Sequence, residues 1–349
     1  MMEKPVRTQG EDAMTRSWSK IALAEAEALA GEIYGLDARA RPLPSERDDT
    51  FRLTDADGRE FTFKIANPAE EPAALAFQDG ALLHLERYAA HVPVPRLVPT
   101  RQGARSFTLQ TAEGGRILRL LTFLQGDLQY RTPHSAAQSR NVGRALAELG
   151  IGLQDYQGRP PVGKLMWDIS HVLDLRAFVG FVGEERRPRA EAVLREVEAA
   201  APRIAALERR QIIHNDFNPH NILMDPAAPE RVTGIIDFGD MVHAPLVNDL
   251  AVALSYHLAS DDWDERAGAF IQGFIAARPL SPPELELLPV LTRARLAMSI
   301  IIAEWRSAQF PENRDYILRN HASAWRGLQT ISDLSADGLN RLVQKTSGA

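Results

Sequence analysis

Cysteine is absent from the 349-residue chain. This absence excludes disulfide bonds, thiolate metal sites and cysteine nucleophiles, and it is compatible with a reducing compartment. The sequence also lacks an apolar run of the roughly 20 residues that a membrane-spanning helix needs. Residues 1–18 are polar and contain no hydrophobic segment of the kind that marks a signal peptide, so we expect a disordered tail there. Together these absences favour a cytoplasmic protein.

Positive charge is also in short supply. Lys and Arg number 40 against 46 Asp and Glu, which gives a net charge of −6 at pH 7. Such a chain offers no general attraction to nucleic acid or anionic lipid, so we expect neither as a partner. The length exceeds what one hydrophobic core usually serves, which predicts two lobes. We expect a strand-rich lobe over residues 19–124 and a mostly helical lobe over residues 125–349.

The second half of the chain contains a predicted β-hairpin. Asn221–Met224 and Gly234–Asp237 are short apolar runs, and the turn-forming segment Asp225–Glu230 lies between them. In a symmetric hairpin Asn221 lies opposite Asp237, and neighbouring strands run roughly 5 Å apart. We therefore expect these two side chains to meet at one edge of the hairpin.

Asp216 lies on the loop that enters this edge. Two carboxylates and an amide oxygen at one point form the hard-oxygen site that Mg²⁺ prefers. The order also matches the phosphoryl-transfer template, in which an Asp accepts the proton of the attacking hydroxyl, while an Asn and the Asp before Phe-Gly hold metal. The residue before the catalytic Asp is Asn215 and not Arg, which favours a small-molecule kinase over a protein kinase.

Lys64 is the candidate cation for the nucleotide phosphates. The strand Glu60–Ala66 places it on the face opposite the aromatic side chains, and a helix begins at Pro72. Glu71 and Gln78 fall on the stripe of this helix that faces inward, where a polar group needs a partner. Either residue is a candidate to hold Lys64 in place, and the sequence does not choose between them.

A glycine-rich phosphate loop does not precede Lys64. The polar segment Leu43–Thr50 stands in its place, and within it Ser45 and Arg47 are candidates to cover the phosphates.

Three further polar residues lie around the catalytic loop. His214 has no orienting partner in the sequence, so a structural role in fixing the loop is favoured over a role as general base. His220 is a candidate to line the cleft. Asp249 is expected to brace the catalytic loop or to cap a helix.

The segments His214–Asn221 and Gly234–Met241 resemble the aminoglycoside phosphotransferase and choline kinase superfamily, and within it the hydroxylysine kinase-like proteins. Leu43–Asp48, Phe63–Asn67 and Val92–Arg96 support this resemblance. It implies an α+β, protein-kinase-like bilobal fold, with a β-rich N-lobe that carries one main helix and a mostly helical C-lobe. It also implies an alcohol phosphotransferase that uses Mg²⁺ and either ATP or GTP.

The resemblance assigns roles to individual residues. Asp216 becomes the catalytic base, and Asn221 and Asp237 become the metal ligands. Residues 121–124, including Thr122 and Leu124, would offer backbone groups to the purine. The implied acceptor is an amino-alcohol or a hydroxylated amino acid, so a cationic amine is expected. Its ammonium would need a carboxylate or an aromatic face, for which the candidates are Glu304, Trp305 and Trp167.

Three alternatives remain open from the sequence. An aminoglycoside kinase shares the same motifs. A nucleotide-binding pseudokinase would act as an interaction module, although none of the expected residues is missing. A metal-dependent hydrolase would use His214, Asp216, His220 and Asp237. The sequence departs from the family pattern at Asn215, where Gly is common.

Overall fold

The computed structural model describes residues 18–45, 48–161, 163–332, 334–335, 337–339 and 341–342. Residues 1–17 of the expected tail, and Arg47, lie outside the described residues. The chain divides into two compact units, one of Met1–Gln125 with Gly158–Lys164 and the other of Gly126–Gln157 with Leu165–Ala349.

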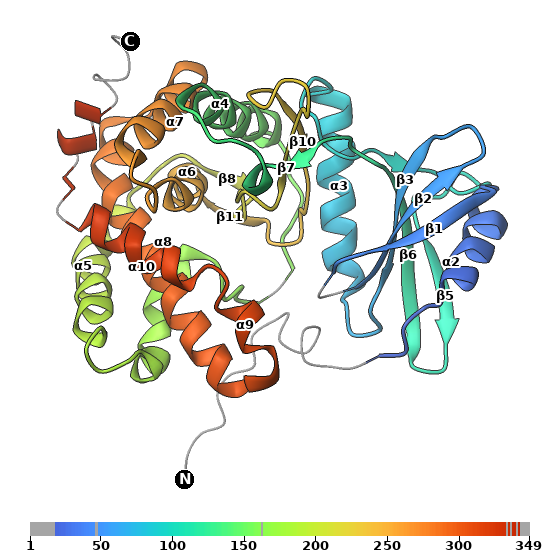
Figure 1. The fold of residues 1–349 in the computed structure, drawn as a ribbon, viewed down its shortest axis with the longest axis horizontal. Helices are drawn as coiled ribbons and strands as arrows, with labels where there is room; N and C mark the ends of the chain where they lie inside the picture. Colours follow the sequence, from blue (N-terminus) through green and yellow to red (C-terminus); the bar gives the residue numbers. More distant parts are fainter. Residues whose placement is uncertain are drawn as a thin grey trace. The chain divides into compact units, whose positions relative to one another are not determined.

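The first unit is built on an antiparallel sheet (Figure 1). Its strands follow the order β1-β2-β3-β6-β4, and β5 pairs with β6. The strands are β1 (Ala38–Leu43), β2 (Asp48–Asp55), β3 (Glu60–Ala66), β4 (Leu97–Val98), β5 (Phe107–Thr111) and β6 (Gly114–Thr122). The tight turn between β2 and β3 depends on Gly58, whose φ is +78°, and on Asp55, whose side chain accepts hydrogen bonds from the amides of Asp57 and Arg59.

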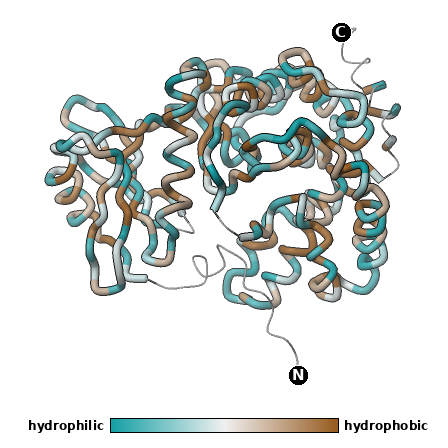
Figure 2. The backbone as a smooth tube through the Cα atoms, turned by 180° about the vertical axis from the view of Figure 1, so that it is seen from behind, coloured by the Kyte–Doolittle hydropathy of each residue, from teal (hydrophilic) through white to brown (hydrophobic). Residues whose placement is uncertain are grey.

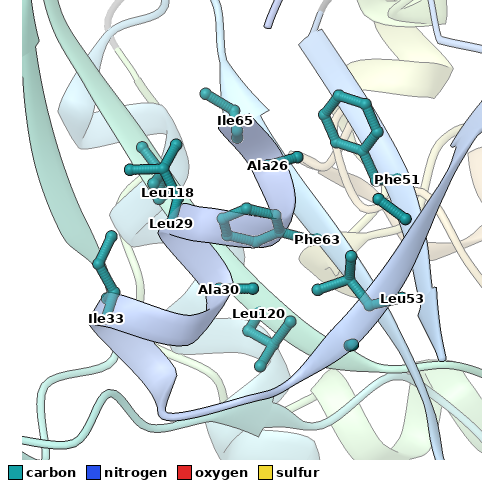
Figure 3. Packing of buried hydrophobic residues seen from close by; sticks show 12 residues of the cluster. Ala26, Leu29, Ala30, Ile33, Phe51, Leu53, Phe63, Ile65, Leu118 and Leu120 are labelled. Atoms are coloured by element: carbon teal, nitrogen blue, oxygen red, sulfur yellow. The ribbon is translucent and has the colours of Figure 1, made fainter. Parts of the chain in front are cut away.

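Helices lie against both faces of this sheet. Helix α2 (Leu23–Leu29) continues into the short π-helix η1 (Ala30–Tyr34) and packs on the apolar face. Figure 3 shows Leu29, Phe63 and Leu120 gathered there from α2, β3 and β6. The other face carries α3 (Pro72–Tyr88), which begins with proline as expected. This second face also carries Lys64, because side chains alternate along β3.

The second unit is mostly helical. Its helices are α4 (Ala136–Leu153), α5 (Arg187–Ala205), α6 (Leu246–Leu254), α7 (Trp263–Ala277), α8 (Pro282–Gln309), α9 (Arg314–Ile317) and α10 (His321–Ile331). Short 3-10 segments are η2 (Gln129–Arg131), η3 (Ile169–Phe181), η4 (Ser255–His257) and η5 (Pro311–Asn313). Along the tube in Figure 2, hydrophobic and hydrophilic residues alternate within the helices, as is typical of helices with one buried face. None of the described helices is both long and apolar enough to cross a membrane.

Two small antiparallel sheets interrupt these helices. One has the order β10-β9-β7 and the other pairs β11 with β8. The strands are β7 (Asp127–Leu128), β8 (Arg210–Ile213), β9 (Ile222–Met224), β10 (Val232–Ile235) and β11 (Val242–Pro245). The predicted hairpin is therefore present as β9 and β10, and the α+β class expected from the sequence is confirmed.

The register of this hairpin differs from the symmetric one that the sequence suggested. Val232 lies opposite Met224, and an irregularity at Thr233 shifts the pairing by one residue before the hairpin reaches the loop. The amide of Ile236 donates to the carbonyl of Asn221 at 2.9 Å. Asn221 therefore lies opposite Ile236, and Asp237 comes one residue later. The difference arises because pairing begins with Val232 opposite Met224, two residues earlier than the symmetric register requires, and the extra residue at Thr233 restores only one of those two positions.

Candidate active site

His214 anchors the start of the loop between β8 and β9. Its side chain is completely buried. The amide of Asp216 donates to Nδ1 of the ring at 3.3 Å, so Nε2 carries the proton and donates to the carbonyl of Ile236 at 3.1 Å. Both ring nitrogens are engaged, which leaves neither to act as a general base. The predicted structural role of His214 is confirmed.

Asp249 on α6 braces the same loop from behind. Its Oδ1 accepts the amide of Asn215 at 2.8 Å, and its Oδ2 accepts the amide of His214 at 3.1 Å. Burial raises the pKa of this carboxyl, and the hydrogen bonds from the two amides offset the effect only in part. The N-cap of α6 is Pro245, without a side-chain cap, so Asp249 braces the loop and does not cap the helix.

Asp216 and Asn221 meet as predicted. Nδ2 of Asn221 donates to Oδ2 of Asp216 at 2.8 Å and to its backbone carbonyl at 3.0 Å. Asn218 closes the turn between them, because its Nδ2 donates to the Asp216 carbonyl and its Oδ1 accepts the amide of His220 at 2.8 Å. Since the Asn221 amide nitrogen is directed at Asp216, its oxygen is the atom that the side chain can offer to a cation.

The surroundings of Asp216 favour its protonated form. Burial, then the nearby carboxylates of Asp240 and Asp237, raise the pKa of Asp216 to about 7, while the guanidinium of Arg295 acts in the opposite direction. The Asp216 side chain still has 23% of its surface exposed. A divalent cation bound next to these carboxylates would lower the pKa again, since an opposite charge favours the ionised form.

Strained backbone lies on both sides of this cluster. Asn215 and Asp237 have φ values of 63° and 65° and are the non-glycine residues with positive φ in the described part of the chain. Asn and Asp tolerate this left-handed region better than other side chains, and such strain gathers at functional sites. The conformation also accounts for Asn215, because glycine and asparagine are the residues that adopt it most readily.

Arg295 on α8 is a site residue that sequence reasoning missed. Its Nη2 lies 3.4 Å from Oδ1 of Asp216, and its side chain is only 2% exposed. An arginine in a helix is usually a surface residue. The signal that could have identified it is its position next to the apolar run from Leu296 to Ala303, since a charge on a buried helix face needs a partner.

Lys64 in the first unit has a different partner from the expected ones. Its Nζ lies 3.1 Å from Oδ2 of Asp48, the first residue of β2. Asp48 also accepts the hydroxyl of Thr50 at 2.5 Å and that of Ser45. Burial alone would raise the pKa of Asp48, but Lys64 and the two hydroxyls hold it below its ordinary value. Ser45, the candidate for covering phosphates, is thus part of the Lys64–Asp48 cluster.

Gln78 and Glu71 do not take the role expected of them. Oε1 of Gln78 accepts a hydrogen bond from Arg119 at 3.2 Å, and the neighbouring Asp79 forms an ion pair with Arg119 at 2.7 Å. Arg119 lies on β6 directly opposite Lys64, and it is the cation that contacts these two side chains of α3. Glu71 is exposed at the N-cap of α3. The expectation that Glu71 or Gln78 holds Lys64 is therefore corrected to Asp48.

Residues 122–124, at the end of β6 and just after it, have most of their backbone amides engaged in hydrogen bonds. The amide of Thr122 donates to the carbonyl of Arg96 at 2.9 Å, and its hydroxyl accepts the Arg96 amide at 2.9 Å. The amide of Phe123 donates to Glu60 at 3.2 Å. The amide and the hydroxyl of Thr122 are thus engaged within the first unit. Among the residues that the structure describes, Leu124 is the one in this segment whose amide makes no hydrogen bond.

Glu304 and Trp305, two of the candidates for the acceptor amine, are engaged in local contacts. Glu304 lies 2.8 Å from Nε2 of His321, and the Trp305 ring packs on Phe178 with centroids 4.6 Å apart. His220 stacks on an aromatic ring from η2 at 4.3 Å. The contacts of Glu304 and Trp305 indicate packing roles for both.

The metal-hydrolase alternative finds no support. Within the described residues, no three His, Asp or Glu side chains gather as ligands for one metal ion. His214 is moreover committed through both ring nitrogens.

Comparison with known proteins places the chain among phosphotransferases, as the motifs around Asp216 suggest. Residues 39–288 match the model of the phosphotransferase enzyme family named APH. The chain is 27% identical over 352 residues to hydroxylysine kinase of Mus musculus, with 93% of each chain covered. It is 30% identical over 257 residues to homoserine kinase of Acidiphilium cryptum, with 70% of this chain and 72% of that protein covered.

Solved structures show the same fold. A microcompartment-associated aminopropanol kinase superposes with a TM-score of 0.70 at 20% identity, covering 91% of this chain and 99% of that one. Amicoumacin kinase, solved with AMP-PNP, Ca²⁺ and Ami, gives 0.64 at 14% identity, covering 86% and 93%.

The fold and the family match define an enzyme that transfers a phosphoryl group to a hydroxyl of a small molecule. The chain belongs to the phosphotransferase enzyme family, and the resemblance inferred from its motifs is confirmed.

Proposed function

We propose that this kinase transfers the γ-phosphoryl group of ATP or GTP to the hydroxyl of an amino-alcohol or hydroxylated amino acid of the hydroxylysine kind. The observation that carries the proposal is the contact between Asp216 and Asn221 on a loop fixed by two buried side chains, His214 and Asp249. The similarity to hydroxylysine and homoserine kinases supports the acceptor class.

Asp216 is assigned to the acceptor hydroxyl. In this role its carboxylate orients the hydroxyl and takes its proton as the new O–P bond forms. The ionised form is the one that accepts a proton, and Arg295 and Asn221 both favour it. The nearby carboxylates of Asp237 and Asp240 make the surroundings negative, which suits an acceptor that carries an ammonium group.

The residues proposed for the metal have the right chemistry. Asn221 offers an amide oxygen, and Asp237 offers an exposed carboxylate, which are the hard-oxygen ligands that Mg²⁺ takes. Mg²⁺ bound there would neutralise charge on the nucleotide phosphates.

The nucleotide is assigned to the first unit. Lys64 supplies a cation for the phosphates and is kept in place by Asp48, and the amide of Leu124 is the donor for the purine ring. Ser45 lies next to the same cation through its contact with Asp48. Catalysis of this kind consists mainly of positioning and charge stabilisation.

The proposal is tested by an acceptor screen. Purified protein is offered ATP or GTP with hydroxylysine, homoserine, ethanolamine, choline and aminoglycosides, and release of nucleoside diphosphate is followed. We expect transfer to a hydroxylated amino acid or amino-alcohol. Nucleotide binding without transfer to any acceptor would contradict the proposal.

The role of Asp216 is tested with Asp216→Asn. We expect kcat to fall by about 100-fold or more, because positioned acid–base groups contribute about that much. The matched control is Asp155→Asn, which changes an exposed aspartate in the same unit. A loss of less than about tenfold would show that Asp216 has another role.

A further inference from the structure

Arg295 is a buried charge in the middle of an apolar helix. It lies within the 28-residue helix α8, and its neighbours Ala294, Leu296 and Met298 are all buried. Burying a guanidinium without partners is strongly unfavourable, so its contacts indicate why it is there.

Those contacts join two segments that are distant in the sequence. Nη1 of Arg295 donates to the backbone carbonyl of Trp167 at 2.9 Å, and the guanidinium lies 5.2 Å from the centre of the Trp167 ring. Nη2 reaches Oδ1 of Asp216 at 3.4 Å. The same Trp167 carbonyl also accepts Nδ2 of Asn215 at 3.4 Å. Trp167 thus holds one terminal nitrogen of the guanidinium and the other contacts Asp216, while the Tyr256 side chain lies beside the same group.

The two oxygens of Asp216 are therefore held by different elements. Asn221, on the same loop, holds Oδ2, and Arg295, from α8, contacts Oδ1. A carboxylate held at both oxygens cannot rotate freely about its last bond. A carboxylate held at only one oxygen can rotate out of the orientation in which it accepts the proton of the acceptor hydroxyl.

We propose that Arg295, itself fixed by Trp167, is a positioning residue that sets the orientation of the Asp216 carboxylate for the acceptor hydroxyl. This proposal rests on the proposed function of Asp216. Arg295 acts through Asp216 and not on the substrate, because only 2% of its side chain is exposed. Removing it should impair the catalytic step and leave binding of nucleotide and acceptor nearly unchanged.

The first test compares Arg295→Met with Arg295→Lys. Met keeps the length and the apolar stem but removes the charge and donors. We expect kcat to fall by about 100-fold, as for a misplacement of a reacting group by about 1 Å. Acceptor KM and nucleotide Kd should stay within about threefold of wild type, because Arg295 does not act on the substrate. Lys restores the charge but cannot reach Trp167 and Asp216 together, so we expect a loss of about tenfold.

The matched control is Arg293→Met on the same helix. Arg293 pairs with Glu196 and donates to the carbonyls of Ile331 and Leu334, and its side chain is 12% exposed. We expect its loss to lower the melting temperature and leave kcat within about twofold, since it has no contact with the proposed site.

A double-mutant cycle separates positioning from a general structural role. If Arg295 acts through Asp216, Arg295→Met should cost less than about threefold when introduced into Asp216→Asn, because interacting residues are non-additive. An equal loss in both backgrounds would overturn the proposal, as would Arg295→Met with kcat within twofold of wild type.

Two further results are also decisive. Should Arg295→Met fail to fold, Arg295→Lys with a kcat within twofold of wild type would overturn the proposal, and a loss confined to kcat would support it. Absence of turnover in the wild-type protein with every acceptor would instead count against the proposed function, before any variant is compared.

Discussion

Asn215 provides a direct test of the strained loop that carries Asp216. Its φ is 63°, its side chain is completely buried, and its Oδ1 has no hydrogen-bond partner among the described residues. Its Nδ2 makes one long contact, 3.4 Å from the carbonyl of Trp167. Asn215→Gly and Asn215→Ala both remove these side-chain atoms, and neither adds an atom that asparagine lacks. The two variants therefore differ mainly in how well their backbones adopt the left-handed conformation.

The expected difference between them follows from the backbone. An L-residue with a Cβ other than Asn or Asp loses about 1–2 kcal/mol in this region. Alanine regains about 0.4–1 kcal/mol because its unfolded chain is less flexible than that of glycine. The net result is that Asn215→Ala should be about 1 kcal/mol less stable than Asn215→Gly. Removing the unpaired Oδ1 offsets the lost contact, so the glycine variant should remain within about 1 kcal/mol of wild type.

Guanidinium chloride unfolding, followed by tryptophan fluorescence and far-UV circular dichroism, measures this difference. A gap of about 1 kcal/mol corresponds to about a fivefold change in the unfolding equilibrium. The order of stability is the decisive observation, because the lost side-chain contacts are the same in both variants. Alanine equal to or more stable than glycine would refute the assignment of strain to residue 215.

Two predictions concern the scaffold. A Cβ added at Gly143 on α4 or at Gly273 on α7 would lie 2.0 or 1.9 Å from a backbone carbonyl oxygen of the facing helix. Either alanine variant should therefore lose about 3 kcal/mol in thermal unfolding. Gly150→Ala should lose far less, because its Cβ would meet only side-chain ends, the nearest that of Arg278 at 3.0 Å. Burial would raise the pKa of Glu284, but the hydrogen bonds from Arg209 and the Ser281 amide hold it below its ordinary value. This stabilisation is present above the unfolded pKa of about 4.3 and is lost as the pH falls from there through the lower folded value. The gap in melting temperature between wild type and Glu284→Gln should therefore shrink below about pH 4.3, and a gap that stays constant down to about pH 3 would contradict the assignment.

The contact between Asp216 and Asn221 could be predicted from the sequence. The two residues are five positions apart on one short loop, so their separation is limited by local geometry. The hairpin that follows was also recognisable from its apolar runs. Its register was not recognisable, because neither the first pair, Met224 with Val232, nor the extra residue at Thr233 leaves a mark in a pattern of turn formers and aliphatic residues.

The partner of Lys64 could not be predicted from the sequence. Glu71 and Gln78 were reasonable candidates, since one heptad separates them on α3. The outcome depends on a competing cation, Arg119 on the neighbouring strand β6, which contacts Gln78 and Asp79 of α3. Asp48, the residue that does contact Lys64, opens the neighbouring strand β2. Side-chain pairing across a sheet depends on strand order, and strand order is a property of the whole unit.

The loop that carries Asp216 is held by two buried charges of opposite sign from two helices. Asp249 on α6 fixes the loop backbone, and Arg295 on α8 contacts the Asp216 side chain. Neither charge is an efficient source of stability, because desolvation offsets much of what its contacts contribute. Their presence is better understood as a requirement of the site. Replacing Arg295 by an apolar residue of similar length should therefore be tolerated by the fold, and the loss should appear in turnover, since stability and activity make different demands on these positions.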